Sequence, residues 1–488
     1  MLTSRNLIWI ATAGILIAVG PAAGQPAAAP TAPIIIGPDT TRVTGPVKDD
    51  GTIDYIAAYN AHQSAGVTAD NNAAVLMVQA FGPGCIGEVV RAQVLDALNL
   101  KDLPEQGAYF VELQADEATV KRTRVELCRK PWRAEDAPVV AAWIAANEPA
   151  LALLTQAAQR PRIWYPACAD PKNPTMLGVM IPALGKLRSV VYALGDRAML
   201  RLGKDDPAGA CADLLTIHRL SRFAGQGGTF IERLVGMAGD SFASNGDQSW
   251  ACDIRVTGAM AKAYLAQLEA LPGLPNIHDA IDAGERFICL DEVMLLRRNG
   301  GDPSFLAPML SIDPSDLPNN LASPDIDWNK VLRQVNAWYD RVAAITSKRF
   351  TEQSPLWEKV KADVVAAKAA VATESDPTER MEDFIVGRFI PMLDMACLNY
   401  EKAETNFEET EVALAARVFY ADKGKWPRDL GELVPAYLKA VPVDRFTDNQ
   451  PLRMRAEGDG LVIWSIGPKS KSATAGPSEG LKTEVHVK

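Results

Sequence analysis

One histidine in this 488-residue chain has acidic neighbours at a spacing that suits metal binding. His278, Asp282 and Glu285 stand at positions i, i+4 and i+7, so on an α-helix their side chains would share one face. An imidazole and two carboxylates are ligands that a divalent metal accepts. The alternative is a solvated acidic helix face, because the sequence shows no fourth ligand. These three residues are the candidate metal ligands.

The other chemical candidates have simpler structural explanations. His218 lies beside Arg219 on a predicted helix, where capping or helix packing is the expected role. Ser241 and Ser244 do not form the Gly-x-Ser-x-Gly turn of a serine hydrolase. The glycine-rich segment 225–228 lacks the strand and lysine of a phosphate-binding loop, so we expect a turn between helices. The sequence therefore predicts no catalytic residue and no cofactor; the alternative is an exported hydrolase with an unrecognised site.

The first 24 residues have the layout of a secretory signal peptide. Arg5 gives a positive start, the uncharged apolar run Leu7–Gly20 follows, and the small residues Ala22 and Gly24 precede the cleavage point. The run is shorter than the roughly 20 residues that a transmembrane helix needs. We therefore expect export to the periplasm or beyond. An uncleaved N-terminal anchor is the alternative, and no further membrane span is predicted.

Composition and charge limit the function classes. The chain is 48% hydrophobic and 23% charged, which is typical of a globular protein and excludes a disordered, fibrous or polytopic membrane chain. Its 50 Lys and Arg against 60 Asp and Glu give a net charge of −10, so it has no general attraction for nucleic acid. The expected partner is another envelope protein, and the expected role is non-catalytic protein–protein interaction or scaffolding.

The rest of the chain divides into four predicted parts. Residues 25–50 are rich in Ala and Pro and predict a tether. Residues 51–400 repeat apolar positions every three or four residues, which predicts a domain of helical hairpins. A small α+β module is predicted over 401–470, followed by a flexible tail over 471–488. The fold class is therefore mainly α.

Within the helical domain, nine segments carry the helical pattern, and one pair predicts strands. The alternating segments 108–113 and 120–127 predict a small β-hairpin. Segment 196–220, around Gly203, resembles a single tetratricopeptide-like helical hairpin, in which small residues let two helices approach closely. The predicted helices are 73–80, 141–159, 182–202, 207–223, 230–237, 256–271, 285–298, 328–346 and 356–373.

The seven cysteines contain no Cys-x-x-Cys pair, which argues against a zinc knuckle or a thioredoxin-type redox site. Two interpretations remain open. Some cysteines could form disulfides in an oxidising compartment, or they could be buried free thiols in a helical core.

The C-terminal module combines a helix with a hairpin. Val412, Ala415 and Phe419 lie on one helical face, and segment 458–460 is a Gly-Asp-Gly turn between two strand patterns. The order "DKGKWP", "LGELVPAYL", "VPVDRF", "LRMR" and "GLVIWSIGP" over about 403–467 resembles the soluble domain of the major pseudopilins of type II secretion systems. The resemblance implies a fold used for contact, and an accessory of such a system is a further alternative. The family's calcium loop corresponds here to 469–472, which has two lysines and no carboxylate, so no calcium site is expected.

Overall fold

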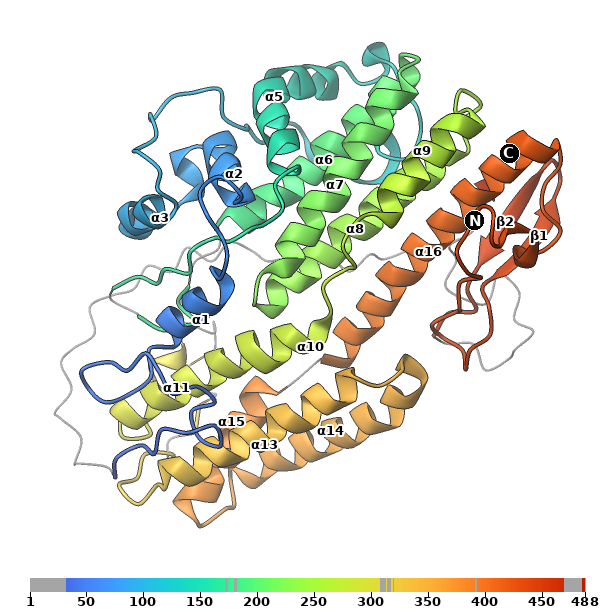
Figure 1. The fold of residues 1–488 in the computed structure, drawn as a ribbon. Helices are drawn as coiled ribbons and strands as arrows, with labels where there is room; N and C mark the ends of the chain where they lie inside the picture. Colours follow the sequence, from blue (N-terminus) through green and yellow to red (C-terminus); the bar gives the residue numbers. More distant parts are fainter. Residues whose placement is uncertain are drawn as a thin grey trace.

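The computed structural model describes residues 32–171, 174–179, 182–307, 313, 317–318, 320–390, 393–468 and 485–487. This part of the chain is mainly helical, with a small antiparallel sheet near the C-terminal end (Figure 1). The elements are α1 (Tyr55–Gln63), α2 (Ala73–Phe81), α3 (Arg91–Ala97), α4 (Glu117–Arg122), α5 (Pro138–Ala157), α6 (Pro182–Gly203), α7 (Pro207–Gln226), α8 (Phe230–Ala251), α9 (Gly258–Glu269), α10 (Ile277–Asp279), α11 (Arg286–Arg298), α13 (Trp328–Thr346), α14 (Phe350–Ala370), α15 (Pro377–Phe389), α16 (Leu393–Lys423), β1 (Arg453–Glu457), β2 (Gly460–Trp464) and β3 (Val485–Val487).

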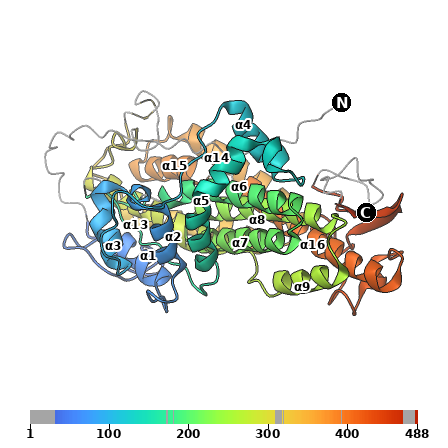
Figure 2. The same ribbon diagram turned by 90° about the horizontal axis from the view of Figure 1, so that it is seen from above.

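Two hydrophobic cores hold the helices together. The first lies among α2, α5, α6, α7, α9 and the C-terminal halves of α8 and α16. The second lies among α1, α11, α13, α14, α15, Met237 of α8 and the first turns of α16. Figure 2 shows the same arrangement from above, with α1 to α3 at one end and the sheet at the other. Because α8 and α16 supply residues to both cores, the two halves are joined by continuous helices.

Local sequence signals explain where the central helices begin and end. Asn72 caps α2 by accepting from the N–H of Ala74, and Gly82 ends this helix at a φ of 73°. Asp206 caps α7 in the same way. At the start of α8, Thr229 and Glu232 form a capping box, each accepting from the backbone N–H of the other. The structure thus confirms that helices begin where the sequence predicts them, at residues 73, 207 and 230.

The sequence boundary placed at residue 401 falls inside α16, which runs unbroken from Leu393 to Lys423. Ala396, near its start, belongs to the second core, whereas Val412 belongs to the first. Ile463 of β2 also belongs to the first core. The predicted helix and hairpin are both present, but they share a core with α6 to α9 rather than forming a unit of their own.

The sheet is stabilised by the pairing of its strands and by the hydrogen bonds of one buried carboxylate. β1 pairs antiparallel with β2, from Arg453 opposite Trp464 to Glu457 opposite Gly460. Asp444 is fully buried and accepts three hydrogen bonds. The donors are the hydroxyl of Ser465 and the backbone N–H groups of Phe446 and Ile466. β3, within the segment predicted to be a flexible tail, pairs antiparallel with β2. Pairing satisfies the second edge of β2, whose backbone groups would otherwise be unpaired.

The β-hairpin predicted over 108–113 and 120–127 is wrong. Residues 117–122 form α4, and a π-helical turn follows it. Asp116 accepts from the N–H of Thr119 and caps the helix, which favours this conformation over a strand. The preceding extended segment bonds to α5 instead, because the N–H of Val111 donates to Asn147.

The described part of the predicted tether, residues 32–50, lies along α11 and α13. Asn329 accepts from the N–H of Ile35 at 2.8 Å, and Asn336 donates to the carbonyl of Thr40 at 2.7 Å. The side chain of Thr40 is fully buried. Asparagine side chains therefore satisfy the extended backbone, and this stretch is not a free linker. The predicted signal peptide, residues 1–24, and the start of the tether lie outside the described residues.

One described helix, α5, is long and apolar enough to cross a membrane by length and composition, a feature that the sequence analysis did not predict. It packs against α2, and Ala150, Leu151 and Leu154 on it are fully buried. These are the contacts of a core helix.

All seven cysteines are free thiols. Four of them, Cys85, Cys128, Cys289 and Cys397, are buried. Burial raises the pKa of the Cys85 thiol to about 11 and that of Cys397 to about 12, so these thiols are protonated at neutral pH. Of the two interpretations left open by the sequence, the structure shows the free thiols.

The close approach of α7 and α8 gives a test with a matched control. A Cβ at Gly236 would lie 2.7 Å from backbone atoms of Ser221 and Gly225, whereas a Cβ at Gly185 on α6 would meet nothing within 4 Å. Gly236→Ala should therefore lower the free energy of unfolding by about 1–3 kcal/mol. Gly185→Ala should leave it unchanged or raise it by about 0.5–1 kcal/mol, because alanine favours the helix. Urea unfolding of both variants measures the difference, and equal effects would contradict this packing.

Candidate functional site

The three candidate metal ligands have separate partners in the structure. Asp282 forms ion pairs with Arg42 and Arg286, with N···O distances of 2.9 and 2.6 Å. Glu285 accepts from a backbone N–H of α8, and Nδ1 of His278 lies 3.1 Å from a carbonyl of α13. The chain forms a π-helical turn here, which changes the spacing assumed for an α-helix. Across the described residues, no three His, Cys, Asp or Glu side chains lie close enough to hold a metal ion.

His218, predicted to have a packing role, lies at the centre of a buried charged cluster. Its Nδ1 is 2.8 Å from Asp240 and its Nε2 is 2.8 Å from Asp247, and all three side chains are buried. Arg222 also donates to Asp240, and the hydroxyl of Tyr264 donates to Asp247. The His218 ring meets Phe407 of α16 edge to face, so the cluster links α7, α8, α9 and α16.

The electrostatics of this cluster favour a charged imidazole. Burial alone lowers the pKa of His218, but the negative charges of Asp240 and Asp247 outweigh it and raise the pKa to about 9. Burial raises the pKa of Asp240, yet His218 and Arg222 together bring it below its ordinary value. Both ring nitrogens are therefore donors, one to each aspartate. In the sequence, His218 and Arg222 are four residues apart and Asp240 and Asp247 are seven residues apart, so each pair lies on one face of its helix.

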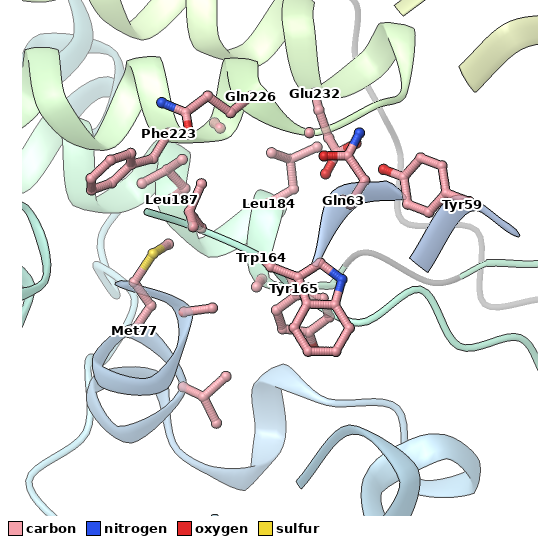
Figure 3. A pocket seen from close by; sticks show the side chains of 16 residues that line it. Tyr59, Gln63, Met77, Trp164, Tyr165, Leu184, Leu187, Phe223, Gln226 and Glu232 are labelled. Carbon is pink, nitrogen blue, oxygen red and sulfur yellow. The ribbon is translucent and has the colours of Figure 1, made fainter. Parts of the chain in front are cut away.

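A groove open to solvent lies where α1, α2 and the segment 163–165 meet α6, α7 and α8 (Figure 3). Its space, including the part open to solvent, is about 620 Å³. A smaller hollow of about 320 Å³ continues it and shares Tyr59, Tyr165 and Glu232 with it. We call the first space the aromatic groove; it is lined by Tyr59, Gln63, Ala74, Met77, Val78, Ile163, Trp164, Tyr165, Ala183, Leu184, Leu187, Phe223, Ala224, Gln226, Gly227 and Glu232.

Two asparagines hold the aromatic residues of the groove in place. The side chain of Asn72, at the start of α2, both accepts from and donates to the backbone of Trp164, at 2.9 Å in each case. Asn60 of α1 makes the same pair of bonds to Ala167, at 2.8 Å. Each amide replaces a neighbouring strand by satisfying the backbone of one residue. The extended segment that carries Trp164 and Tyr165 is therefore fixed on both sides.

Tyr59 and Glu232 form the polar corner of the groove. The hydroxyl of Tyr59 accepts from the N–H of Gly228 at 2.8 Å and is hydrogen-bonded to Glu232. Burial raises the pKa of Glu232, and its bonds from Thr229 and Tyr59 oppose this shift. The predicted helix-to-helix turn at 225–228 is confirmed, since it joins α7 to α8. Its glycines allow the close approach: a Cβ at Gly228 would lie 2.3 Å from the Tyr59 ring.

Two residues that line the groove each carry a buried polar atom with no hydrogen-bond partner among the described residues. These atoms are the indole Nε1 of Trp164 and the hydroxyl of Tyr165. A buried donor without a partner costs about 1–3 kcal/mol, so native structures hold few of them. Well-separated tryptophans in a helical domain, such as Trp164, can line a groove but are more often core anchors, so the sequence position of Trp164 alone does not mark a site. No motif marked this site, because it is built from segments distant in the chain.

Comparisons of the chain with protein-family models, with curated proteins and with solved structures found no match. The pseudopilin resemblance of the C-terminal segment is therefore still a prediction. The geometry of the aromatic groove and of the buried cluster is the basis for assigning a role.

The charge of His218 predicts a pH dependence of stability. Its pKa in the folded protein is about 9, above the ordinary 6.5, so its contribution is fully present below pH 6.5 and is lost as the pH rises to about 9. Between these values the loss is about 1.4 kcal/mol per pH unit. Urea unfolding at pH 7 and pH 9 should show this slope in the wild type and in His62→Gln, an exposed-site control. His218→Gln should reduce the slope, and an unchanged slope would show that His218 is uncharged in the folded protein.

Proposed function

We propose that this protein is an exported, non-catalytic binding protein of the cell envelope whose partner or ligand occupies the aromatic groove. Export is inferred from the signal-like sequence of residues 1–24. The groove carries the binding role, because a concave apolar site with a few placed polar groups is the usual form of a ligand pocket.

The chemistry of the groove supports binding rather than catalysis. Glu232 is the one carboxyl group among the described residues that line it, and these include no His, Cys, Ser or Lys besides. Proton transfer or nucleophilic attack requires an acid, base or nucleophile that can reach the reacting atom. Glu232 already accepts from the backbone and the hydroxyl of Thr229, which commits it to the capping of α8.

A second candidate role is contact with a secretion system through the C-terminal segment. The observation that favours it is the order of α16, β1 and β2, which is the order of the pseudopilin soluble domain. In that case the partner would dock near the hairpin, at the end of the molecule opposite α1 to α3 (Figure 1). The two roles use different surfaces, so they predict different effects of substitutions.

Filling the groove tests the first role. Leu184 on α6 lines the groove, whereas Val365 on α14 is 66% exposed and lies outside it. Protein purified from its own envelope with a C-terminal tag is expected to carry a bound molecule or partner, detected by native mass spectrometry. Leu184→Trp should lower the bound fraction at least tenfold, an effect of about 1.4 kcal/mol, through steric overlap. Val365→Trp should leave it unchanged.

Three outcomes would contradict the groove as the binding site. The first is an equal bound fraction in Leu184→Trp and Val365→Trp. The second is a secretion-system partner that is lost only in Trp426→Ala, a variant of the C-terminal segment; this outcome would favour the second role. Elemental analysis gives the third outcome. A stoichiometric divalent metal that is lost on His278→Ala would replace the binding role with a metal-dependent hydrolase.

A further inference from the structure

We propose that the segment Asp444–Phe446 is a pH-sensitive latch, which holds the C-terminal hairpin of β1 and β2 against α16 and α14 in acid and loosens as the pH rises. The proposal follows from the contacts of this segment and from the imbalance of charge around Arg445. It is independent of the aromatic groove and of its occupant.

Each residue of the latch contacts a different part of the protein. Asp444 accepts from the N–H of Ile466 at 2.9 Å, which ties the segment to the end of β2. Phe446 meets Phe350 of α14 edge to face, with ring centroids 5.1 Å apart. With Ile466 these two rings form a small hydrophobic cluster that is separate from the two main cores. Arg445 lies between the two anchors and reaches α16.

This middle residue pairs with three carboxylates on one face of α16. The guanidinium nitrogens of Arg445 lie 3.3 Å from an oxygen of Glu401, 2.9 Å from one of Glu404 and 2.8 Å from one of Glu408. The glutamates stand at positions i, i+3 and i+7, so successive turns of the helix present them to one cation. One positive charge balances only one of the three when all are ionised. The latch is therefore attached through a cluster with surplus negative charge.

The cations around the cluster have acidic partners of their own. Arg222 of α7 is paired with Asp240 of α8, and Lys439 is paired with Glu269 of α9. Arg233 of α8 acts on the neighbouring Tyr400, and it too has carboxylates beside it. These pairs are close to neutral, so they do not offset the surplus.

The other titratable groups that face the glutamates add no positive charge. They are the carboxyl groups of Glu411 and Asp444, the phenol of Tyr400 and the thiol of Cys397. Protonation of the glutamates relieves the surplus, because a protonated carboxyl group is neutral and can still accept from Arg445.

The glutamates hold protons more tightly in the folded protein than in the unfolded chain. Burial raises the pKa of Glu401, Glu404 and Glu408 above the ordinary 4.5, although Arg445 opposes the shift. Burial and the neighbouring carboxylates raise the pKa of Glu411 to about 7. A raised carboxyl pKa adds stability that is complete below the ordinary value and is lost as the pH rises through the raised one. The cluster therefore attaches the latch most firmly in acid and weakens toward alkaline pH.

Loosening of the latch has a local structural consequence. Phe446 and Ile466 are almost fully buried while the segment is closed. Opening would uncover these side chains and Phe350 without disturbing the main cores, because their cluster is separate. The pH would thus control an apolar surface beside the sheet, at one end of the molecule (Figure 1).

Hydrogen exchange of the full-length protein tests the latch. Peptide 441–451 contains the N–H of Phe446, which donates to Asp444. Its protection, corrected for the intrinsic exchange rate, should fall about tenfold between pH 5.5 and pH 8.5, the effect of a change of about one unit in carboxyl pKa. Equal protection at the two pH values, or no protection at either, would overturn the latch.

Glu404→Gln separates the charge from the packing. Glutamine keeps the size and an oxygen for Arg445 but cannot ionise. Protection of peptide 441–451 should match the wild type at pH 5.5 and exceed it about fivefold to tenfold at pH 8.5. Glu358→Gln is the matched control, since it removes a 70% exposed carboxylate that is paired with Lys361, and it should follow the wild type.

The three proteins are compared at the same pH, so the pH dependence that His218 contributes cancels. A Glu404→Gln profile that parallels the wild type would show that packing alone holds the segment, and the latch proposal would then be wrong.

Discussion

The packing of α7 against α8 depends on a positive charge with no access to solvent. His218 lies between Asp240 and Asp247, and Arg222 adds a second cation to the same cluster. Two carboxylates buried without these cations would carry a large desolvation cost, which the ion pairs with His218 and Arg222 offset. The charge pattern also selects one register of the two helices, since a shift of either would separate the partners. Phe223 of α7 and Glu232 of α8 owe their relative positions to this register.

The groove depends on a different kind of constraint, which is the use of side-chain amides in place of a β-strand. Asn60 and Asn72 hold an extended segment that has no neighbouring strand in the described structure. Asn72 has a second task, because the same side chain caps α2. The start of this helix and the position of Trp164 are therefore fixed by one residue. This coupling explains how a loop between α5 and α6 can present two large aromatic side chains in a defined place.

Local signals in the sequence predicted most of the helices but not the site. The cap at Asn72, the stop at Gly82 and the turn at 458–460 depend on neighbouring residues, and the structure contains all three features. The metal hypothesis for His278 assumed an α-helical spacing that a π-helical turn does not provide. The groove combines α1, α2, 163–165 and the α7–α8 turn, which meet only after folding, so no single stretch could reveal it. The sequence places His218 and Arg222 on one face of α7 and Asp240 and Asp247 on one face of α8, but it does not show that these two faces meet.

The length of α16 has a mechanical consequence. At 1.5 Å per residue its 31 residues reach about 46 Å, and the helix contacts one core near its beginning and the other near its end. β2 packs against α16, which also contacts α14, so this one helix connects the sheet with the second core. Neither core can lose its segment of α16 without breaking a helix that the other core stabilises. The two halves of the protein are therefore coupled through a continuous helix.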